Sequence, residues 1–141
     1  MPDEARAIAR FVRTSPRKAR RVVDLIRGKD LKQALAILKF TPNIAARAIE
    51  KVVNSAAANA ETNHDMSRDF LWVSCCYVDE GPAMKRLRRG SMGRGGLIRK
   101  RMSHITVVVS EREEMRQAAE RARRGRRRTP RREPVAAEGE T

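Results

Sequence analysis

Cysteine is scarce in this 141-residue sequence, and its placement excludes two common kinds of site. The only cysteines, Cys75 and Cys76, are adjacent, a spacing that suits neither an ordinary structural disulfide nor paired tetrahedral metal ligands. We therefore interpret both as small strand residues. We expect no metal site.

Long apolar runs are also missing. No stretch approaches the roughly 18 to 20 uncharged apolar residues that a membrane span requires. The first residues, MPDEARAIARFVR, lack the apolar core of a signal peptide. These two features predict a cytoplasmic protein with no membrane span.

Acidic residues are absent from one long segment, residues 81–110, which holds eight Lys and Arg. The whole chain has a net charge of +15, from 32 basic and 17 acidic residues. Residues 1–80 hold 14 basic and 10 acidic residues, and residues 111–141 hold 10 and 7. More than half of the net charge is therefore concentrated in this one segment. Such a concentration predicts a polyanionic partner, with nucleic acid as the first candidate.

Groups that could perform catalysis are few. His64 and His104 are isolated from each other and belong to no spaced metal cluster, so each is interpreted as a structural or phosphate-contacting donor. The segment SMGRGG, residues 91–96, lacks the Gly-Lys-Ser/Thr ending of a phosphate-binding loop and is interpreted as a turn. We expect no cofactor and no enzymatic activity.

Three helices are predicted between residues 15 and 63. In the first, Ser15 caps the start, Pro16 fits the first turn and Gly28 ends the helix. The second begins at Asp30, and the third is predicted to begin with Thr41 as its cap and Pro42 at its first position. The buried faces predicted for the three helices contain Ala19, Val22, Val23 and Ile26; Leu31, Ala34, Leu35 and Leu38; and Ala45, Ala48, Ile49, Val52, Ala56 and Ala60.

Strands are predicted on either side of the basic segment. Weak alternation over residues 6–13 indicates a short edge strand, FLWVSCCYV at 70–78 a largely buried strand, and HITVVVS at 104–110 another strong strand. Gly90, Gly93, Gly95 and Gly96 lie midway between the last two, where the chain must reverse. Residues 81–104 are thus expected to form a protruding hairpin, roughly 30 Å long at about 3.3 Å per residue.

Aromatic side chains are few, and most occur in apolar patterns. The set is Phe11, Phe40, Phe70, Trp72 and Tyr77. We interpret Trp72 and Tyr77 as packing residues, which leaves few platforms on which unpaired bases could stack. The expected mode of recognition is contact with the phosphates and the shape of folded RNA.

Four motifs in order resemble the family of bacterial large-subunit ribosomal protein twenty-two. They are SPRKARRVVDLIRGK at 15–29, SAAANAETN at 55–63, VDEGPAMKR at 78–86 and SHITVVVS at 103–110. The resemblance covers about residues 10–110. It implies an α+β fold in which three helices pack on a small three-stranded antiparallel sheet, with a long protruding β-hairpin. The composition of the last residues adds a basic C-terminal tail, to which the resemblance assigns no role. We expect residues 1–112 to form one domain and residues 113–141 a disordered or partly helical tail.

The resemblance also implies a function: a structural constituent of the large ribosomal subunit that binds large-subunit rRNA, supports assembly and contacts neighbouring ribosomal proteins. Basic residues of the first helix and of the hairpin arms are the expected rRNA contacts, and the hairpin tip is expected to line the nascent-peptide exit tunnel. The expected rRNA contacts are Arg13, Ser15, Arg17, Lys18, Arg20, Arg21, Lys29, Lys85, Arg86, Arg88, Arg99, Lys100, Arg101 and His104. The expected tunnel-lining residues are Arg89, Gly90, Ser91, Met92, Gly93, Arg94 and Gly95.

Two other functions are weighed against this one. A DNA-binding or nucleoid protein would carry a similar charge, and equal affinity for duplex DNA and for rRNA fragments would favour it. An RNA-modifying enzyme would need a cofactor loop or a catalytic cluster, and neither is evident in the sequence. Cofactor-dependent turnover by the purified protein would favour the enzyme.

Overall fold

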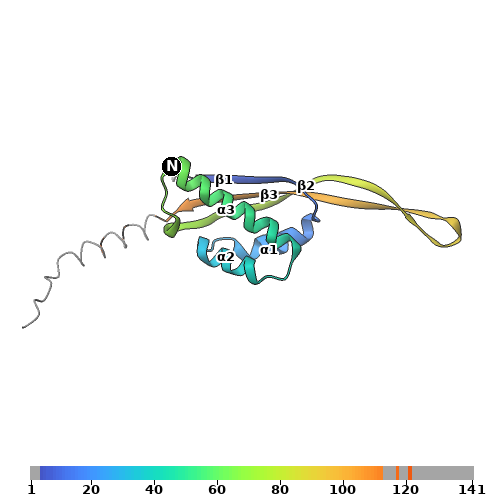
Figure 1. The fold of residues 1–141 in the computed structure, drawn as a ribbon, viewed down its shortest axis with the longest axis horizontal. Coiled ribbons are helices and arrows are strands. Elements are labelled where there is room, and N and C mark those ends of the chain that lie inside the picture. Colours follow the sequence, from blue (N-terminus) through green and yellow to red (C-terminus); the bar gives the residue numbers. More distant parts are fainter. Residues whose placement is uncertain (1–3, 113–116, 118–120, 122–141) are drawn as a thin grey trace, which may run out of the picture.

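The computed structural model describes residues 4–112 together with Gln117 and Arg121. In this part of the chain one strand is followed by three helices and then by two long strands (Figure 1). The order is β1 (Glu4–Val12), α1 (Pro16–Ile26), α2 (Leu31–Phe40), α3 (Ile44–His64), β2 (Leu71–Arg89) and β3 (Gly95–Glu111), with short 3-10 turns at Arg68–Phe70 and Ser91–Gly93.

The three strands form one antiparallel sheet in the order β1-β3-β2. β1 is therefore an edge strand, as predicted, and β3 is central. All three helices lie on one face of the sheet and leave the other face without a helix (Figure 1). The predicted α+β class, with three helices on a three-stranded antiparallel sheet and a long hairpin, is confirmed.

The core lies between the helices and the inner face of the sheet. The residues of β2 that point inward include Val73, Cys76 and Val78, and an irregularity between Val73 and Cys75 interrupts the strict alternation. Their neighbours Cys75 and Tyr77 are exposed, so the strand predicted at 70–78 is fully buried on its inner face only. In an antiparallel sheet covered on a single side, half of each strand necessarily faces outward.

The first two helices follow the sequence prediction closely. All four predicted apolar residues of α1 are buried, and Gly28 has the positive φ of 72° that suits a residue just past a helix end. Ser15 and Asp30 occupy the N-cap positions of α1 and α2, although neither side chain makes a capping hydrogen bond. In α2, Leu31, Ala34 and Leu38 are buried.

The predicted start of the third helix is wrong by two residues. The N-cap of α3 is Asn43, whose side chain accepts a hydrogen bond from the Ala45 amide at 3.0 Å. Thr41 instead belongs to the end of α2, where its hydroxyl donates to the Ile37 carbonyl at 2.6 Å. A Thr-Pro pair fits either role, and the chain uses it to end one helix before Asn43 starts the next.

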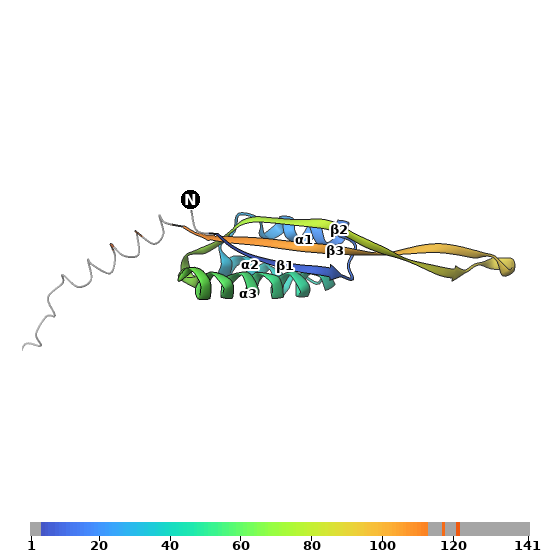
Figure 2. The same cartoon turned by 90° about the horizontal axis from the view of Figure 1, so that it is seen from above.

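Beyond the sheet, β2 and β3 continue as a two-stranded ribbon (Figures 1 and 2). The β1 pairing ends at Val12 opposite Ser103, whereas the β2–β3 pairing continues from Ala83–Arg101 to Arg89–Gly95. At the tip, Met92 and Gly93 have positive φ values of 55° and 70°. The predicted reversal near the glycine cluster is therefore present.

Two further expectations concern the C-terminal tail and the absence of a membrane span. The basic tail at 113–141 lies outside them, apart from Gln117 and Arg121. Among the helices that are described, none has the length and apolarity to cross a membrane.

Candidate nucleic-acid interface

The hairpin arms place cations directly opposite one another. Lys85 of β2 is the cross-strand partner of Arg99 of β3, and like charges in such positions repel. The exposed arms offer no buried apolar face in compensation, since even the apolar pair Leu87 and Leu97 is 78% and 72% exposed. A bound anion would remove this repulsion, so the arms are better suited to a polyanion than to free solution.

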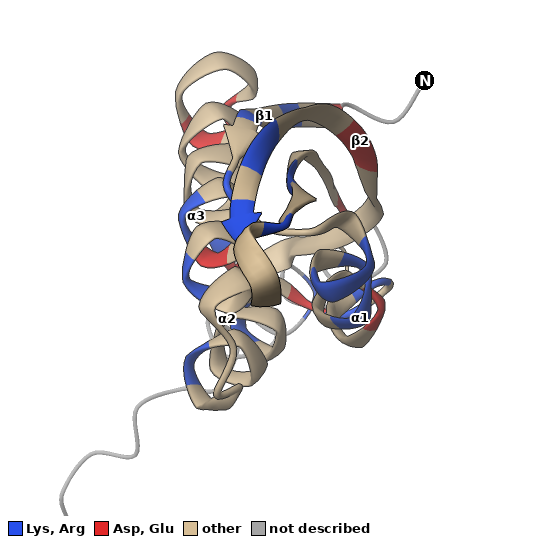
Figure 3. Cartoon of the chain, turned by 90° about the vertical axis from the view of Figure 1, so that its right-hand side faces the viewer, with Lys and Arg blue, Asp and Glu red and all other residues tan. Residues whose placement is uncertain are grey.

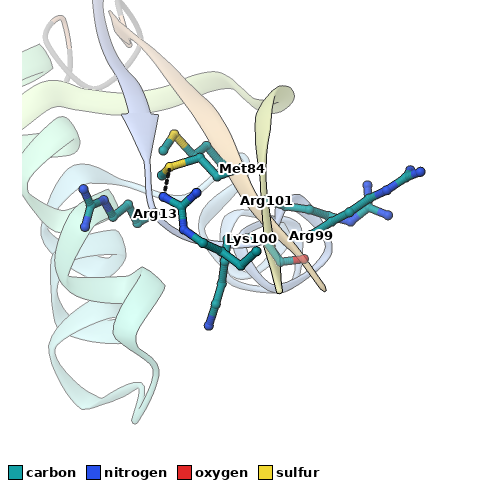
Figure 4. A pocket seen from close by; sticks show the side chains of 8 residues that line it. Arg13, Met84, Arg99, Lys100 and Arg101 are labelled. Atoms are coloured by element: carbon teal, nitrogen blue, oxygen red, sulfur yellow. Dashed lines mark hydrogen bonds between the residues drawn. The ribbon is translucent and has the colours of Figure 1, made fainter. Parts of the chain in front are cut away.

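At the base of the hairpin the chain forms a basic groove with a volume of about 690 Å³. Its walls come from the β1–α1 connection and from both hairpin arms, segments that are far apart in the sequence (Figure 4). We call it the basal groove. The residues that line it are Arg13, Ser15, Met84, Arg86, Arg99, Lys100, Arg101 and Met102.

The lining of the basal groove carries only positive charge, since five of its eight residues are Lys or Arg and none is acidic. Arg99 and Arg101 project together from one side of β3 and Lys100 from the other, as strand geometry requires (Figure 4). Met84 accepts a hydrogen bond from Arg86 Nη2 on its sulfur at 3.2 Å, which holds that guanidinium along the groove. Ser15 adds the N-terminal end of α1, where helix amides favour anions.

A second hollow, of about 460 Å³, continues from the basal groove along α1. It shares Arg13 and Ser15 with the groove and adds Lys18 and Arg21 from the outer face of the helix. Basic segments run along α1 in the view toward the hairpin end (Figure 3). The two hollows together form one concave, cationic path from the hairpin to α1.

Several of the expected rRNA contacts lie elsewhere. Lys85 and Arg88 are on the hairpin but do not line the basal groove, and Lys29 is past the opposite end of α1. Arg17 is exposed on α1 but lines neither hollow. Arg20 is engaged within the protein, where its Nε and Nη2 donate to the Val78 carbonyl at 3.2 and 3.1 Å.

His104 lies on the face of the sheet that carries no helix. Its Nδ1 accepts a hydrogen bond from the Phe11 amide at 3.0 Å, and the two rings meet edge to face with centroids 4.9 Å apart. The structure thus assigns His104 a local role in holding Phe11.

Sequence reasoning missed a third hollow, of about 310 Å³, on this open face of the sheet. Its residues include Phe11 and Tyr77, which are 58% and 39% exposed, so the interpretation of Tyr77 as a packing residue is wrong. Trp72 is half-buried, beneath the Arg112 guanidinium at 5.0 Å. The full lining is Arg6, Ile8, Arg10, Phe11, Tyr77, Asp79, His104 and Thr106.

The described part of the chain contains no group of three or more His, Cys, Asp or Glu that could hold a metal ion. The adjacent cysteines are both free, with Cys75 exposed and Cys76 buried. Burial raises the pKa of the Cys76 thiol above its ordinary value, which keeps the group protonated and unreactive. Both therefore serve as strand residues on opposite faces.

Comparison with known proteins identifies the family. The model of the family described as ribosomal protein L22p/L17e matches residues 7–110. Three similar proteins, each named large ribosomal subunit protein uL22, come from Halothermothrix orenii, Desulforamulus reducens and Carboxydothermus hydrogenoformans, with identities of 66%, 61% and 60% over 111 residues. Each alignment covers 79% of this chain and 98% of the relative. This chain therefore belongs to the L22p/L17e family of ribosomal proteins.

Proposed function

We propose that the chain is a structural constituent of the large ribosomal subunit, in the cytoplasm, and that it binds large-subunit rRNA through the basal groove and the hairpin arms. It is not an enzyme, in keeping with relatives that are named as ribosomal proteins. Neighbouring large-subunit proteins are its expected protein partners, and subunit assembly the process that it supports.

The observation that carries this proposal is the convergence of cations at the hairpin base. Arg13, Arg86, Arg99, Lys100 and Arg101 come from three segments of the chain and line one groove without an acidic residue. Holding these cations close together costs Coulomb energy, and the attraction of bound phosphates offsets that cost. Because the deep, narrow major groove of an A-form RNA helix does not admit side chains, these cations favour phosphate contact and recognition of RNA shape.

The hairpin tip has a separate role in this proposal. The two-stranded ribbon carries residues 89–95 away from the sheet and helices (Figure 2), so they can reach a site that the rest of the molecule cannot enter. Met92 is 94% exposed there. Family resemblance supplies the location, the wall of the nascent-peptide tunnel, and the geometry supports it by making the tip narrow and remote.

Competitive incorporation into subunits tests the proposal. Cells expressing a tagged Arg86→Ala/Arg99→Ala/Arg101→Ala variant beside the untagged protein should contain large subunits depleted of the tagged copy. The three side chains line the groove and contribute nothing to the core, so the variant should retain the wild-type unfolding temperature. Lys51→Ala, which removes an exposed cation from α3, is the matched control and should be incorporated normally.

Two results would contradict the proposal. One is full incorporation of the triple variant. The other is equal affinity of the purified wild-type protein for duplex DNA and for large-subunit rRNA fragments, which would favour a DNA-binding protein. A folded variant that is depleted from subunits, with preference of the wild type for rRNA, is the expected outcome.

A further inference from the structure

The open face of the sheet carries an exposed aromatic and cationic surface that the basal groove does not use. In one cross-strand row, Thr106 of β3 lies between Ile8 of β1 and Tyr77 of β2. Next to this row lies His104, with Phe11 against its ring. Arg6 and Arg10 of the edge strand complete the hollow. Large side chains that are left outside a core, beside cations, form a surface suited to a ligand.

Phe11 occupies an unusual backbone conformation. Its φ of 58° lies in the left-handed region, which an aromatic residue adopts only at a cost in free energy. The residue lies in the irregularity of β1 between Ala9 and Val12, where the pairing with β3 shifts. Two contacts fix it there: the bond from its amide to His104 Nδ1 and the edge-to-face ring contact.

The strained conformation of Phe11 contributes little to the stability of the fold. Phe11 is 58% exposed, so its ring adds little apolar burial to offset the strained backbone. Strain that persists without a packing benefit is a feature of binding sites. What the strain achieves is to present a preorganised aromatic ring on a surface that also holds Tyr77 and two arginines.

Resting on the proposed function, we infer that this open face binds unpaired nucleotides of the RNA, with bases stacking on Phe11 and Tyr77 and phosphates contacting Arg6 and Arg10. Exposed aromatic rings beside cations are the general means by which proteins hold single-stranded RNA. Asp79 is the one acid in the hollow, against two arginines, so the charge there still favours an anionic ligand. An apolar protein segment would leave the two arginines without a group of opposite charge.

The inference is tested with the full-length protein and two labelled probes: a single-stranded 12-nucleotide oligouridylate and a 12-base-pair RNA duplex. Stacking contributes about 1 to 3 kcal/mol per base. Phe11→Ala and Tyr77→Ala should therefore each weaken oligouridylate binding by about fivefold or more. Duplex affinity should change less than about twofold, because a paired base offers no free face to stack. Anisotropy titrations measure both.

Conservative and matched variants separate stacking from a general loss of structure. Phe11→Tyr and Tyr77→Phe keep a ring and should restore oligouridylate affinity. Phe40→Ala removes an aromatic side chain that is 84% exposed at the end of α2, outside this hollow, and should leave affinity unchanged. Should Phe11→Ala unfold the β1 edge, Tyr77→Ala still provides the test, because Tyr77 has an ordinary strand backbone.

Wild-type oligouridylate affinity in both Ala variants would overturn the inference and would leave the open face as a surface for a protein partner. Equal losses for oligouridylate and duplex would also overturn it, because they would show that the rings do not discriminate unpaired bases. Neither result would affect the rRNA role of the basal groove. That role fails separately, if the wild-type protein binds neither probe at low salt.

Discussion

Replacing Lys85 by Glu should strengthen the free hairpin and weaken its RNA binding at the same time. Lys85 lies directly opposite Arg99, so the substitution changes a repulsive cross-strand pair into an attractive one. Such pairs contribute roughly 0.2 to 1 kcal/mol each, and the reversal of sign makes the expected gain about 1 kcal/mol. Amide hydrogen exchange of the hairpin arms should then slow by about fivefold, since 1.4 kcal/mol corresponds to a factor of ten.

The same substitution should weaken RNA binding and make it less dependent on salt. Each phosphate contact contributes about 0.7 to 0.9 to the slope of log affinity against log salt concentration. Removing one cation and adding one anion should therefore reduce the magnitude of that slope by about 1 to 2. Titrations of a large-subunit rRNA fragment at several salt concentrations measure it.

Two control variants isolate the effect. Lys85→Gln removes the repulsion without adding attraction, so its exchange rate and salt slope should fall between those of the wild type and Lys85→Glu. Lys51→Glu introduces the same charge change on α3, outside the basic path, and should alter neither the hairpin exchange nor the slope by a comparable amount. Faster hairpin exchange in Lys85→Glu, or RNA binding with an unchanged slope, would refute the reasoning.

Three further predictions concern the sheet and its core. Arg20→Ala should lower the free energy of unfolding by about 1 kcal/mol in urea titrations, because two bonds to the Val78 carbonyl are lost. The slope of log RNA affinity against log salt concentration should stay near the wild-type value in this variant. A large fall in that slope would indicate that Arg20 contacts phosphate instead. Ile49→Ala should cost about 2 to 5 kcal/mol, since that side chain is fully buried, and a loss below 1 kcal/mol would contradict the packing. Iodoacetamide should alkylate Cys75 and spare Cys76 in mass spectra of the folded protein, and both should react in urea.

The elements that sequence reasoning predicted well are those governed by local rules. The apolar stripe of α1 is buried as predicted, and Gly28 ends the helix because its left-handed backbone favours a residue without a side chain. The hairpin could be predicted because an acid-free segment with a central glycine cluster lies between two strongly apolar strands. Periodicity and turn chemistry act over a few residues, and the sequence displays them directly.

What could not be predicted depends on contacts between distant segments. Neither the approach of Arg13 to the hairpin base nor the internal use of Arg20 has a signal in the local sequence, because each depends on how α1 and β1 pack beside β2. The open face was missed for a related reason. The irregularity at Phe11 breaks the alternation of β1, so a period of two does not show which side of the strand its ring occupies.

The central claim, that the hairpin and basal groove hold the chain on large-subunit rRNA, is tested most directly by sedimenting ribosomal subunits through washes of increasing salt. If the claim is right, the wild-type protein comigrates with the large subunit at low and moderate salt. The Arg86→Ala/Arg99→Ala/Arg101→Ala variant is released at a lower salt concentration, because it has lost groove cations. A wild-type protein that sediments apart from large subunits at every salt concentration would contradict the claim.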